Sequence, residues 1–315
     1  MKKIAAFFKL VRWQNLLMVA LVMLLVYHCV LSPLSYFSDI DIFPSSISFV
    51  LLVISLIFIV AASYVINDVF DVETDKYNKP EKKLIPNVFS QKEANLYYVI
   101  LTFLGLTSGL VSSILVLNVK FYMLLAVIVL LACILYSYSS TYKKKLFVGN
   151  LIVSLSVAIA VFLPYLFELL YLSDNVLFLS ECKDLVKNIV YFVLIYTVFA
   201  FLLTLIREII KDVEDMDGDG RTHCRTIPVV YGLSKTKTML YILVVLLLIL
   251  LFAYLLILFK LQLFAVFAFI AVVTLCSIIL IVKIFKAKEK KCFHSLSNMT
   301  KVMMLIGILS MLFLR

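Results

Sequence analysis

Apolar segments of about 20 residues recur along the whole chain, and a helix of that length spans a bilayer's hydrocarbon core. Short polar stretches separate these segments. Nine of them can be distinguished, at about 13–31, 46–66, 94–117, 119–138, 146–172, 187–209, 237–259, 261–282 and 298–314. The pattern predicts an all-α polytopic membrane protein with nine transmembrane helices. The fifth segment contains Pro164 and Glu168, so we expect it to kink or to end early.

The composition leads to the same class of protein. Hydrophobic residues make up 64% of the chain and the mean hydropathy is +1.11, whereas a globular protein is roughly 45–50% apolar. A soluble fold could not bury this much apolar surface. The first 19 residues begin with a basic stretch like a signal peptide, but the apolar stretch continues too far and lacks a cleavage site of small residues. We therefore expect an uncleaved first helix.

Basic residues alternate between the two ends of the predicted spans. Of the 29 lysines and arginines, 24 lie at the N-terminus or in every second loop, and five lie on the opposite side. The positive-inside rule then places the N-terminus on the cytoplasmic side of the inner membrane. The net charge of +10 reflects this topology and attracts anionic membrane lipids. Because the charge is dispersed between spans, we expect no nucleic-acid partner, and nothing indicates an obligate protein partner.

Two acidic clusters share the spacing D-x-x-D-x-x-x-D, and each directly follows a long apolar segment. The first cluster consists of Asp68, Asp71 and Asp75, and the second of Asp212, Asp215 and Asp219. On a helix, three residues at this spacing fall within about 60° of arc. Two facing carboxylate stripes require cations between them, and ligands that are all oxygen suit Mg²⁺, which keeps positions free for phosphate. The clusters therefore predict a magnesium enzyme that binds a diphosphate at the cytoplasmic membrane surface.

Three other interpretations of the clusters are weaker. A solvated acidic loop does not explain two copies with one spacing. The run from Asp215 to Gly220 matches the start of a calcium-binding EF-hand loop, but its twelfth position is Thr226 rather than glutamate. A cation-coupled transporter is the remaining alternative, although such carboxylates are expected in mid-span rather than at span ends. His28 and His294 lie far from both clusters in the sequence and are expected to be structural.

The equal spacing of the clusters indicates an internal duplication. Asn15-Leu16-Leu17 near the first span is echoed by Asn150-Leu151-Ile152 near the fifth. We expect a single domain made of two pseudo-symmetric four-helix halves, at about 10–145 and 146–283, plus a final helix at 298–314, around a central cavity. The stretches 76–92 and 218–237 leave the helical pattern and could cap this cavity.

Basic residues surround the second cluster. Arg207 and Lys211 share a helix face, and Arg207 falls where the sixth span is still apolar, which favours a functional role. Arg221 and Arg225 follow the cluster, and Lys143 belongs to a basic loop on the same side. We expect Arg207 and Lys211 to bind phosphate.

The two clusters and their flanks resemble the signatures of the UbiA superfamily of intramembrane prenyltransferases. The resemblance covers the chain from about residue 10 to the last span. It is carried by Arg12-Trp13-Gln14-Asn15, by Asn67-Asp68-x-x-Asp71-x-x-x-Asp75 with Asn78-Lys79-Pro80, and by Arg207-Glu208-Ile209-Ile210-Lys211-Asp212-Val213-Glu214-Asp215-x-x-x-Asp219 with Arg225-Thr226-Ile227-Pro228-Val229-Val230-Tyr231-Gly232.

The resemblance implies nine helices around a cavity in which Mg²⁺ bridges the two motifs and a prenyl diphosphate. It implies that Asp68, Asp71, Asp75, Asp212, Asp215 and Asp219 bind metal, with Asp68, Asp71, Asp212 and Asp215 catalytic. Substrate would be bound by Asn15, Asn67, Lys143, Arg207, Lys211, Arg221 and Arg225. The family's Arg-Pro-x-x-x-Gly motif is replaced here by Lys82-Lys83-Leu84-Ile85-Pro86-Asn87-Val88, and lysine cannot form a bidentate fork.

The second motif favours transfer of a prenyl group, geranylgeranyl in our expectation, to a lipid acceptor such as geranylgeranylglyceryl phosphate. An aromatic quinone precursor is the alternative acceptor, because the residues present could serve either.

Overall fold

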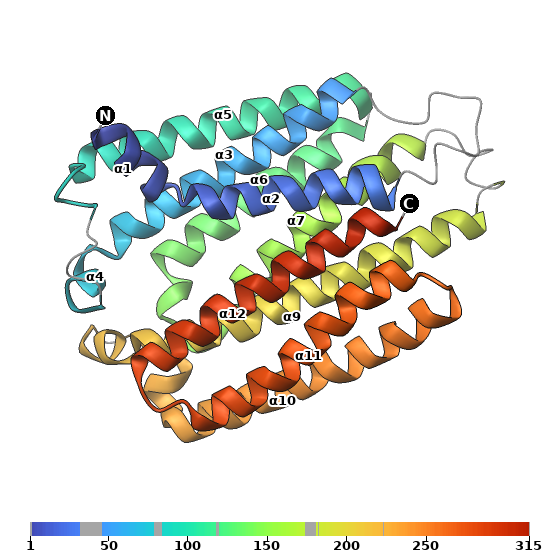
Figure 1. Cartoon of the computed structure of the whole chain (residues 1–315). Coiled ribbons are helices and arrows are strands. Elements are labelled where there is room, and N and C mark those ends of the chain that lie inside the picture. The colour runs from blue at the N-terminus through green and yellow to red at the C-terminus, as the bar shows by residue number, and fades with distance from the viewer. Residues whose placement is uncertain are drawn as a thin grey trace. The chain divides into compact units, whose positions relative to one another are not determined.

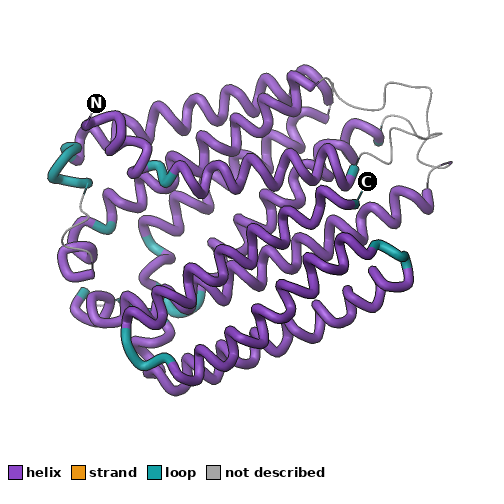
Figure 2. The backbone as a smooth tube through the Cα atoms, in the orientation of Figure 1, coloured by secondary structure: helices purple, strands orange, loops and turns teal. Residues whose placement is uncertain are grey.

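The structure, a computed structural model, describes residues 2–31, 46–78, 84–117, 120–173, 181, 183–222 and 224–314. Every regular element in these ranges is a helix (Figure 2). Nine helical segments of the described chain are long and apolar enough to cross a membrane. They are α2 with η1 (Trp13–Val30), α3 (Ser46–Phe70), α5 (Gln91–Leu117), α6 (Phe121–Ser140), α7 (Val148–Leu172), α9 (Lys183–Arg221), α10 (Ile227–Lys260), α11 (Phe264–Lys286) and α12 with η6 (Lys290–Phe313). The prediction of an all-α integral membrane protein is confirmed.

The helices extend beyond the apolar segments that predicted them. Helix α9 continues to Arg221 and α10 begins at Ile227, so the prediction that 218–237 leaves the helical pattern is wrong except for a short connection. Apolarity marks the part of a helix that lies in lipid, whereas backbone hydrogen bonding continues into the polar part. One residue interrupts the regular path of α10. Gly232 has φ 77°, a conformation that glycine adopts without steric cost.

The fifth span runs its full length despite two unfavourable residues. Helix α7 continues through Pro164 and ends at Leu172, so the expected early end is wrong. Transmembrane helices tolerate proline because neighbouring groups can satisfy the freed backbone positions. Glu168 is only 1% exposed, which shows that the helix accommodates this acid by burying it.

Contacts divide the chain into two compact units. The first comprises Met1–Tyr142 and Ile159–Val193, and the second Lys143–Ala158 and Leu194–Arg315. The division passes through α7 and α9, so the units do not coincide with the two sequence halves at 10–145 and 146–283. Those halves remain a proposal about duplication rather than a description of packing.

In the first unit, close packing of α3 against α5 and α6 holds the helix that leads to the first cluster (Figure 1). A Cβ atom at Gly105 would lie 2.7 Å from Ile59, and one at Gly109 would lie 2.7 Å from the Ser55 hydroxyl. Only glycine permits this approach, as in small-xxx-small contacts of membrane helices. Serine hydroxyls strengthen the contact: Ser55 donates to the Gly105 carbonyl and Ser112 to the Ser48 carbonyl, each at 2.7 Å.

The N-terminal helix α1 (Lys2–Leu10) belongs to the same unit and ends in a sharp change of direction. Its apolar side joins the core formed with α3 and α5, where Leu10 is fully buried and Phe7 packs edge-on against Tyr97. Arg12 then adopts a left-handed conformation, φ 53° and ψ 52°, before α2 begins. This conformation costs about 1–2 kcal/mol for a residue with a Cβ atom.

In the second unit, α10, α11 and α12 pack one after another (Figure 1). Helix α9 is fixed by buried tyrosines. Tyr196 shares a 2.7 Å hydrogen bond with Ser310 of η6, and its ring meets that of Tyr254 edge-on. These contacts hold the helix that carries the second cluster.

Candidate active site

The first cluster lies where α3 passes into the short helix α4 (Val72–Asn78). The amide of Asp71 donates to the Asn67 carbonyl at 2.9 Å, and that of Asp75 donates to the Asp71 carbonyl at 2.8 Å. Hydrogen bonding from residue i to i−4 therefore continues through the cluster. The helical path expected for these aspartates is confirmed.

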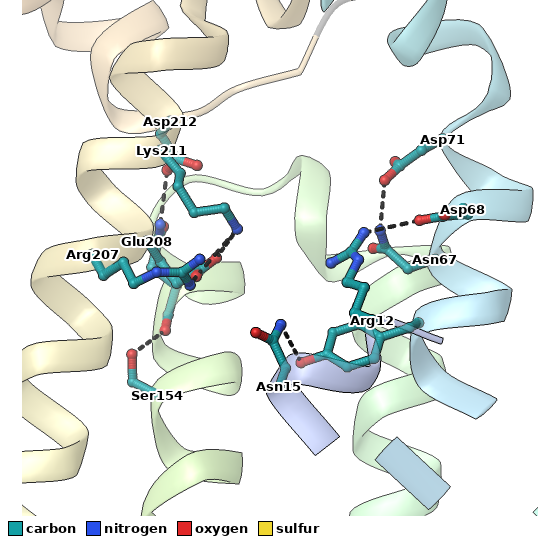
Figure 3. A network of polar contacts seen from close by, with 12 residues as sticks. Arg12, Asn15, Asn67, Asp68, Asp71, Ser154, Arg207, Glu208, Lys211 and Asp212 are labelled. Carbon is teal, nitrogen blue, oxygen red and sulfur yellow. Dashed lines mark hydrogen bonds and ion pairs between the residues drawn. The ribbon is translucent and has the colours of Figure 1, made fainter. Parts of the chain in front are cut away.

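Asn67 and Asp71 form a buried pair at this junction, and each is 8% exposed. The Asn67 Nδ2 donates to Asp71 Oδ2 at 2.7 Å (Figure 3). The other side-chain atom of Asn67, Oδ1, is buried without a hydrogen-bond donor among the described residues. An unpaired buried acceptor is costly. This amide oxygen beside a carboxylate is the kind of ligand that a hard divalent cation binds.

Arg12 brings a positive charge to the same cluster. Its Nη2 donates to Asp68 Oδ1 at 2.9 Å (Figure 3), and its guanidinium lies 4.7 Å from the centre of the Tyr64 ring. Partial burial alone would lower the pKa of Arg12, but the Asp68 carboxylate, with smaller effects of Tyr64 and Asp71, raises it above its usual range. Arg12 therefore remains charged. Asn15 joins this group by donating to the Tyr64 hydroxyl at 3.1 Å.

The second cluster lies on an unbroken helix, the last turns of α9. The side chain of Asn150, from the first turn of α7, donates to Asp212 Oδ2 at 2.7 Å. Asp219 is 8% exposed, whereas Asp217, which is outside the repeated spacing, is exposed. The repeated aspartates are thus buried at Asp219 and half-buried at Asp212 and Asp215, and the additional one is exposed.

The two cations that precede the second cluster both bind Glu208. Arg207 Nη1 lies 2.8 Å from Glu208 Oε1, and Lys211 Nζ lies 3.0 Å from Oε2 (Figure 3). The side chain of Glu208 is 10% exposed. The expected grouping of Arg207 with Lys211 is present, and Glu208 joins them. Because one carboxylate holds both, the pair retains one net positive charge.

The remaining basic residues lie at the polar end of the second unit. Arg221 ends α9, and both Arg221 and Arg225 are exposed. The Arg225 amide donates to the Lys144 carbonyl at 3.0 Å. This bond joins the loop after α9 to η5 (Tyr142–Lys144), which contains Lys143. The main chain therefore brings two basic loops together.

His294 is not remote from the second cluster, contrary to expectation. Its Nδ1 lies 3.0 Å from Glu214 Oε1, because α12 begins beside the end of α9. Distance along the sequence gave no indication of this packing. The loop residues 79–83 and His223 lie outside the described residues, so the expectations for Lys82, Lys83 and the complete 76–92 cap concern positions that the structure does not describe.

The donor groups fit a divalent cation. Within the described residues, no three carboxylate, histidine or cysteine side chains converge on one point. Magnesium in enzymes commonly uses only one or two carboxylates and fills its octahedron with water and substrate phosphate. Each cluster supplies this type of donor, and the first adds the Asn67 Oδ1.

Sequence reasoning missed three participants: Arg12 as the partner of Asp68, Glu208 as the partner of two cations, and Asn150 as the partner of Asp212. Asn150 had a signal, since its tripeptide echoes the one at Asn15. Glu208 also had a signal, because it lies three residues before Lys211 on one helix. Arg12 stood within a family-like motif, but spacing along the chain does not reveal its pairing with Asp68, 56 residues away.

Comparison with known proteins defines the class to which this fold and site belong. The model described as the UbiA prenyltransferase family matches residues 34–302. A digeranylgeranylglyceryl phosphate synthase from Sulfurisphaera tokodaii is 30% identical over 246 residues, which cover 77% of each chain. The chain belongs to the UbiA prenyltransferase family, and this favours an enzyme over the transporter alternative.

Further relatives and solved structures are similar to this chain in sequence or in fold. A digeranylgeranylglyceryl phosphate synthase from Saccharolobus solfataricus is 33% identical over 187 residues, and the match spans 58% of its length and 59% of this chain. A solved structure described as digeranylgeranylglyceryl phosphate synthase in membranes superposes with a TM-score of 0.62 at 26% identity, covering 99% of this chain and 98% of that one. A UbiA homologue from Archaeoglobus fulgidus bound to GPP and Mg²⁺ shares the fold, with a TM-score of 0.60 at 17% identity, over 97% of this chain and 99% of its own.

Proposed function

We propose that this protein transfers a prenyl group, geranylgeranyl, from its diphosphate to geranylgeranylglyceryl phosphate in a reaction that requires Mg²⁺. One observation carries the proposal: each of two aspartate clusters, at the ends of membrane-spanning helices, presents buried oxygen ligands beside basic side chains. The names of the relatives at about 30% identity support the lipid acceptor, and the homologue with bound GPP and Mg²⁺ supports a prenyl diphosphate donor and the metal.

The proposed metal ligands follow the two clusters. Asn67, with the first-cluster carboxylates Asp68, Asp71 and Asp75, would hold one ion. The second-cluster carboxylates Asp212, Asp215 and Asp219 would hold another. When bound, the ions would neutralise charge that develops on the departing diphosphate.

The protein's own cations would share that task. Arg207 and Lys211 are held together on Glu208, so they are organised before substrate arrives. As the allylic carbon–oxygen bond breaks, its electron pair stays on the diphosphate, and fixed donors directed at that oxygen stabilise the transition state. The acceptor hydroxyl forms the new carbon–oxygen bond and gives its proton to the departing diphosphate. Exclusion of water would protect the allylic cation from hydrolysis.

The acceptor would be recognised through its phosphate. Lys143, Arg221 and Arg225 supply cations at the polar end of the second unit, where the Arg225–Lys144 main-chain bond draws two basic loops together. Asn15 would contribute on the side of the first cluster through its contact with Tyr64. An aromatic acid would need a flat ring pocket instead of a phosphate site.

The positive-inside distribution supports a cytoplasmic location of the N-terminus and of both clusters. We propose that the reaction takes place at the cytoplasmic side of the cell membrane, where a soluble diphosphate head and a lipid-embedded chain can be bound together.

A parallel acceptor assay tests the proposal. Purified full-length protein receives radiolabelled geranylgeranyl diphosphate with geranylgeranylglyceryl phosphate, 4-hydroxybenzoate or 1,4-dihydroxy-2-naphthoate. We expect product with the glyceryl phosphate lipid alone. Turnover of only an aromatic acid would overturn the acceptor, and the absence of any prenyl transfer would overturn the proposed reaction.

A further inference from the structure

The residue that holds Asp212 comes from a different helix. Asn150 lies in the first turn of α7, is 8% exposed, and donates its Nδ2 to Asp212 Oδ2 at 2.7 Å. The Asn150 main-chain carbonyl accepts a 2.7 Å hydrogen bond from the buried Ser154 hydroxyl. The helix itself holds the main chain of Asn150, and its side chain makes the contact with α9.

The chemistry of an amide suits a carboxylate that must also bind a cation. An amide N–H donates to one oxygen without adding charge, so it fixes the orientation of the carboxylate without competing electrostatically with a metal ion. A lysine or arginine at this place would neutralise the ligand. In the same turn of α9, the cations Arg207 and Lys211 are paired with Glu208.

The first cluster contains the same pairing in another form. Asn67 donates to Asp71 at 2.7 Å from the same helix, four residues earlier. Each cluster therefore has one aspartate held by a buried asparagine, although the asparagine of the second cluster comes from another helix. The recurrence supports a role for a neutral donor beside one aspartate of each cluster.

We infer that Asn150 is a positioning residue that holds the Asp212 carboxylate in the orientation from which it binds a divalent cation. The inference rests on the proposed function, because it assigns Asn150 a role toward the proposed metal ligand. Partners that orient metal ligands typically affect metal affinity by about 10- to 100-fold when they are removed.

The test is direct binding of Mn²⁺ to the purified full-length protein, measured by the electron paramagnetic resonance of unbound Mn²⁺ without prenyl substrate. An Asp71→Asn background weakens Mn²⁺ binding to the first cluster, so that the measurement reports Mn²⁺ binding to the second cluster. We expect Asn150→Ala to weaken Mn²⁺ binding by roughly tenfold. Asn150→Ser, which retains a shorter donor, should restore part of the affinity.

A thermodynamic cycle distinguishes positioning from a general packing effect. In an Asp212→Ala background, adding Asn150→Ala should not change Mn²⁺ binding further, because the partner is already absent. Ser154→Ala is the matched control in α7: it removes the contact to the Asn150 backbone but keeps the amide beside Asp212, and we expect unchanged affinity.

Kinetics provide a second measurement on the same variants. Asn150→Ala should raise the Mg²⁺ concentration for half-maximal transfer by roughly the factor seen in Mn²⁺ binding, with most of kcat restored at saturating Mg²⁺. Unchanged Mn²⁺ affinity in both Asn150 variants would overturn the inference while leaving the proposed function intact. Failure of the wild-type protein to bind Mn²⁺ would instead overturn the proposed metal site itself.

Discussion

The two aspartate clusters have the same spacing but their charges are compensated differently. In the first cluster, Asp68 is bound by a charged arginine and Asp71 by a neutral amide. In the second, Asp212 is bound by a neutral amide, and the nearby cations are held by a separate glutamate. A metal ion entering the first cluster must therefore compete with Arg12 for Asp68. Equal spacing in the sequence thus produces two sites that we expect to differ in affinity for the metal.

The backbone differs as well. The first cluster spans the junction of α3 and α4, and its arginine is presented by a residue in a left-handed conformation. The second is part of one continuous helix of 39 residues. Strained residues of this kind concentrate at functional sites and persist where the surrounding structure holds them in place. At Arg12, the contacts with Asp68 and Tyr64 hold the side chain of the strained residue.

The largest expected effect comes from neutralising one amide-bound aspartate in each cluster. Asp71→Asn or Asp212→Asn keeps the shape of the side chain but removes the charge that a divalent ion requires. We expect each to reduce prenyl transfer by at least about 100-fold, similar to the loss of other electrostatic groups in active sites. Asp217→Asn, at the exposed aspartate of the same helix, is the control and should retain wild-type rates. If either cluster variant were fully active, that cluster would not take part in the proposed reaction.

A change in helix packing should affect the frame of the first cluster. A Cβ atom at Gly105 would lie 2.7 Å from Ile59 Cγ1 and 3.1 Å from the Ser55 carbonyl oxygen. Gly105→Ala should therefore reduce stability by about 1–3 kcal/mol, the usual cost of overpacking. Thermal unfolding of the purified protein in detergent measures this loss. Gly307→Ala is the matched control, because a Cβ atom there meets no other atom within 4 Å. Equal stability of both variants would contradict the close α3–α5 contact.

Much of this fold was predictable because apolar length alone identifies helices that cross a membrane. All nine predicted spans correspond to helices, but the ends of α9 and α10 were wrong, since a helix can leave the membrane without ending. The site residues were also predicted only in part. The repeated spacing located the aspartates, whereas the partners Arg12 and Asn150 depend on how helices pack, and sequence spacing does not contain that information. Glu208 lies three residues from Lys211 on one helix, so spacing could have indicated that pair. The duplicated halves remain a prediction.

The smallest effect distinguishes the two clusters most finely. Arg12→Gln removes the cation that competes for Asp68, so Mn²⁺ should bind the first cluster more tightly. A partly exposed ion pair contributes roughly 0.2–1 kcal/mol, so the gain should not exceed about fivefold. An Asp212→Asn background weakens the second cluster, and the measurement then reports the first. This increase in Mn²⁺ affinity is opposite to the decrease expected for Asn150→Ala. Weaker Mn²⁺ binding by Arg12→Gln would show that Arg12 assists the metal and does not compete with it.

The dependence of prenyl transfer on a divalent ion tests the central claim most directly. Purified protein is treated with EDTA, given geranylgeranyl diphosphate and geranylgeranylglyceryl phosphate, and then titrated with Mg²⁺. We expect no product in chelator and full recovery as Mg²⁺ exceeds it, because the carboxylates of both clusters cannot bind a diphosphate without cations. Full turnover in EDTA would contradict the assignment of these aspartates as the metal ligands of a prenyltransferase.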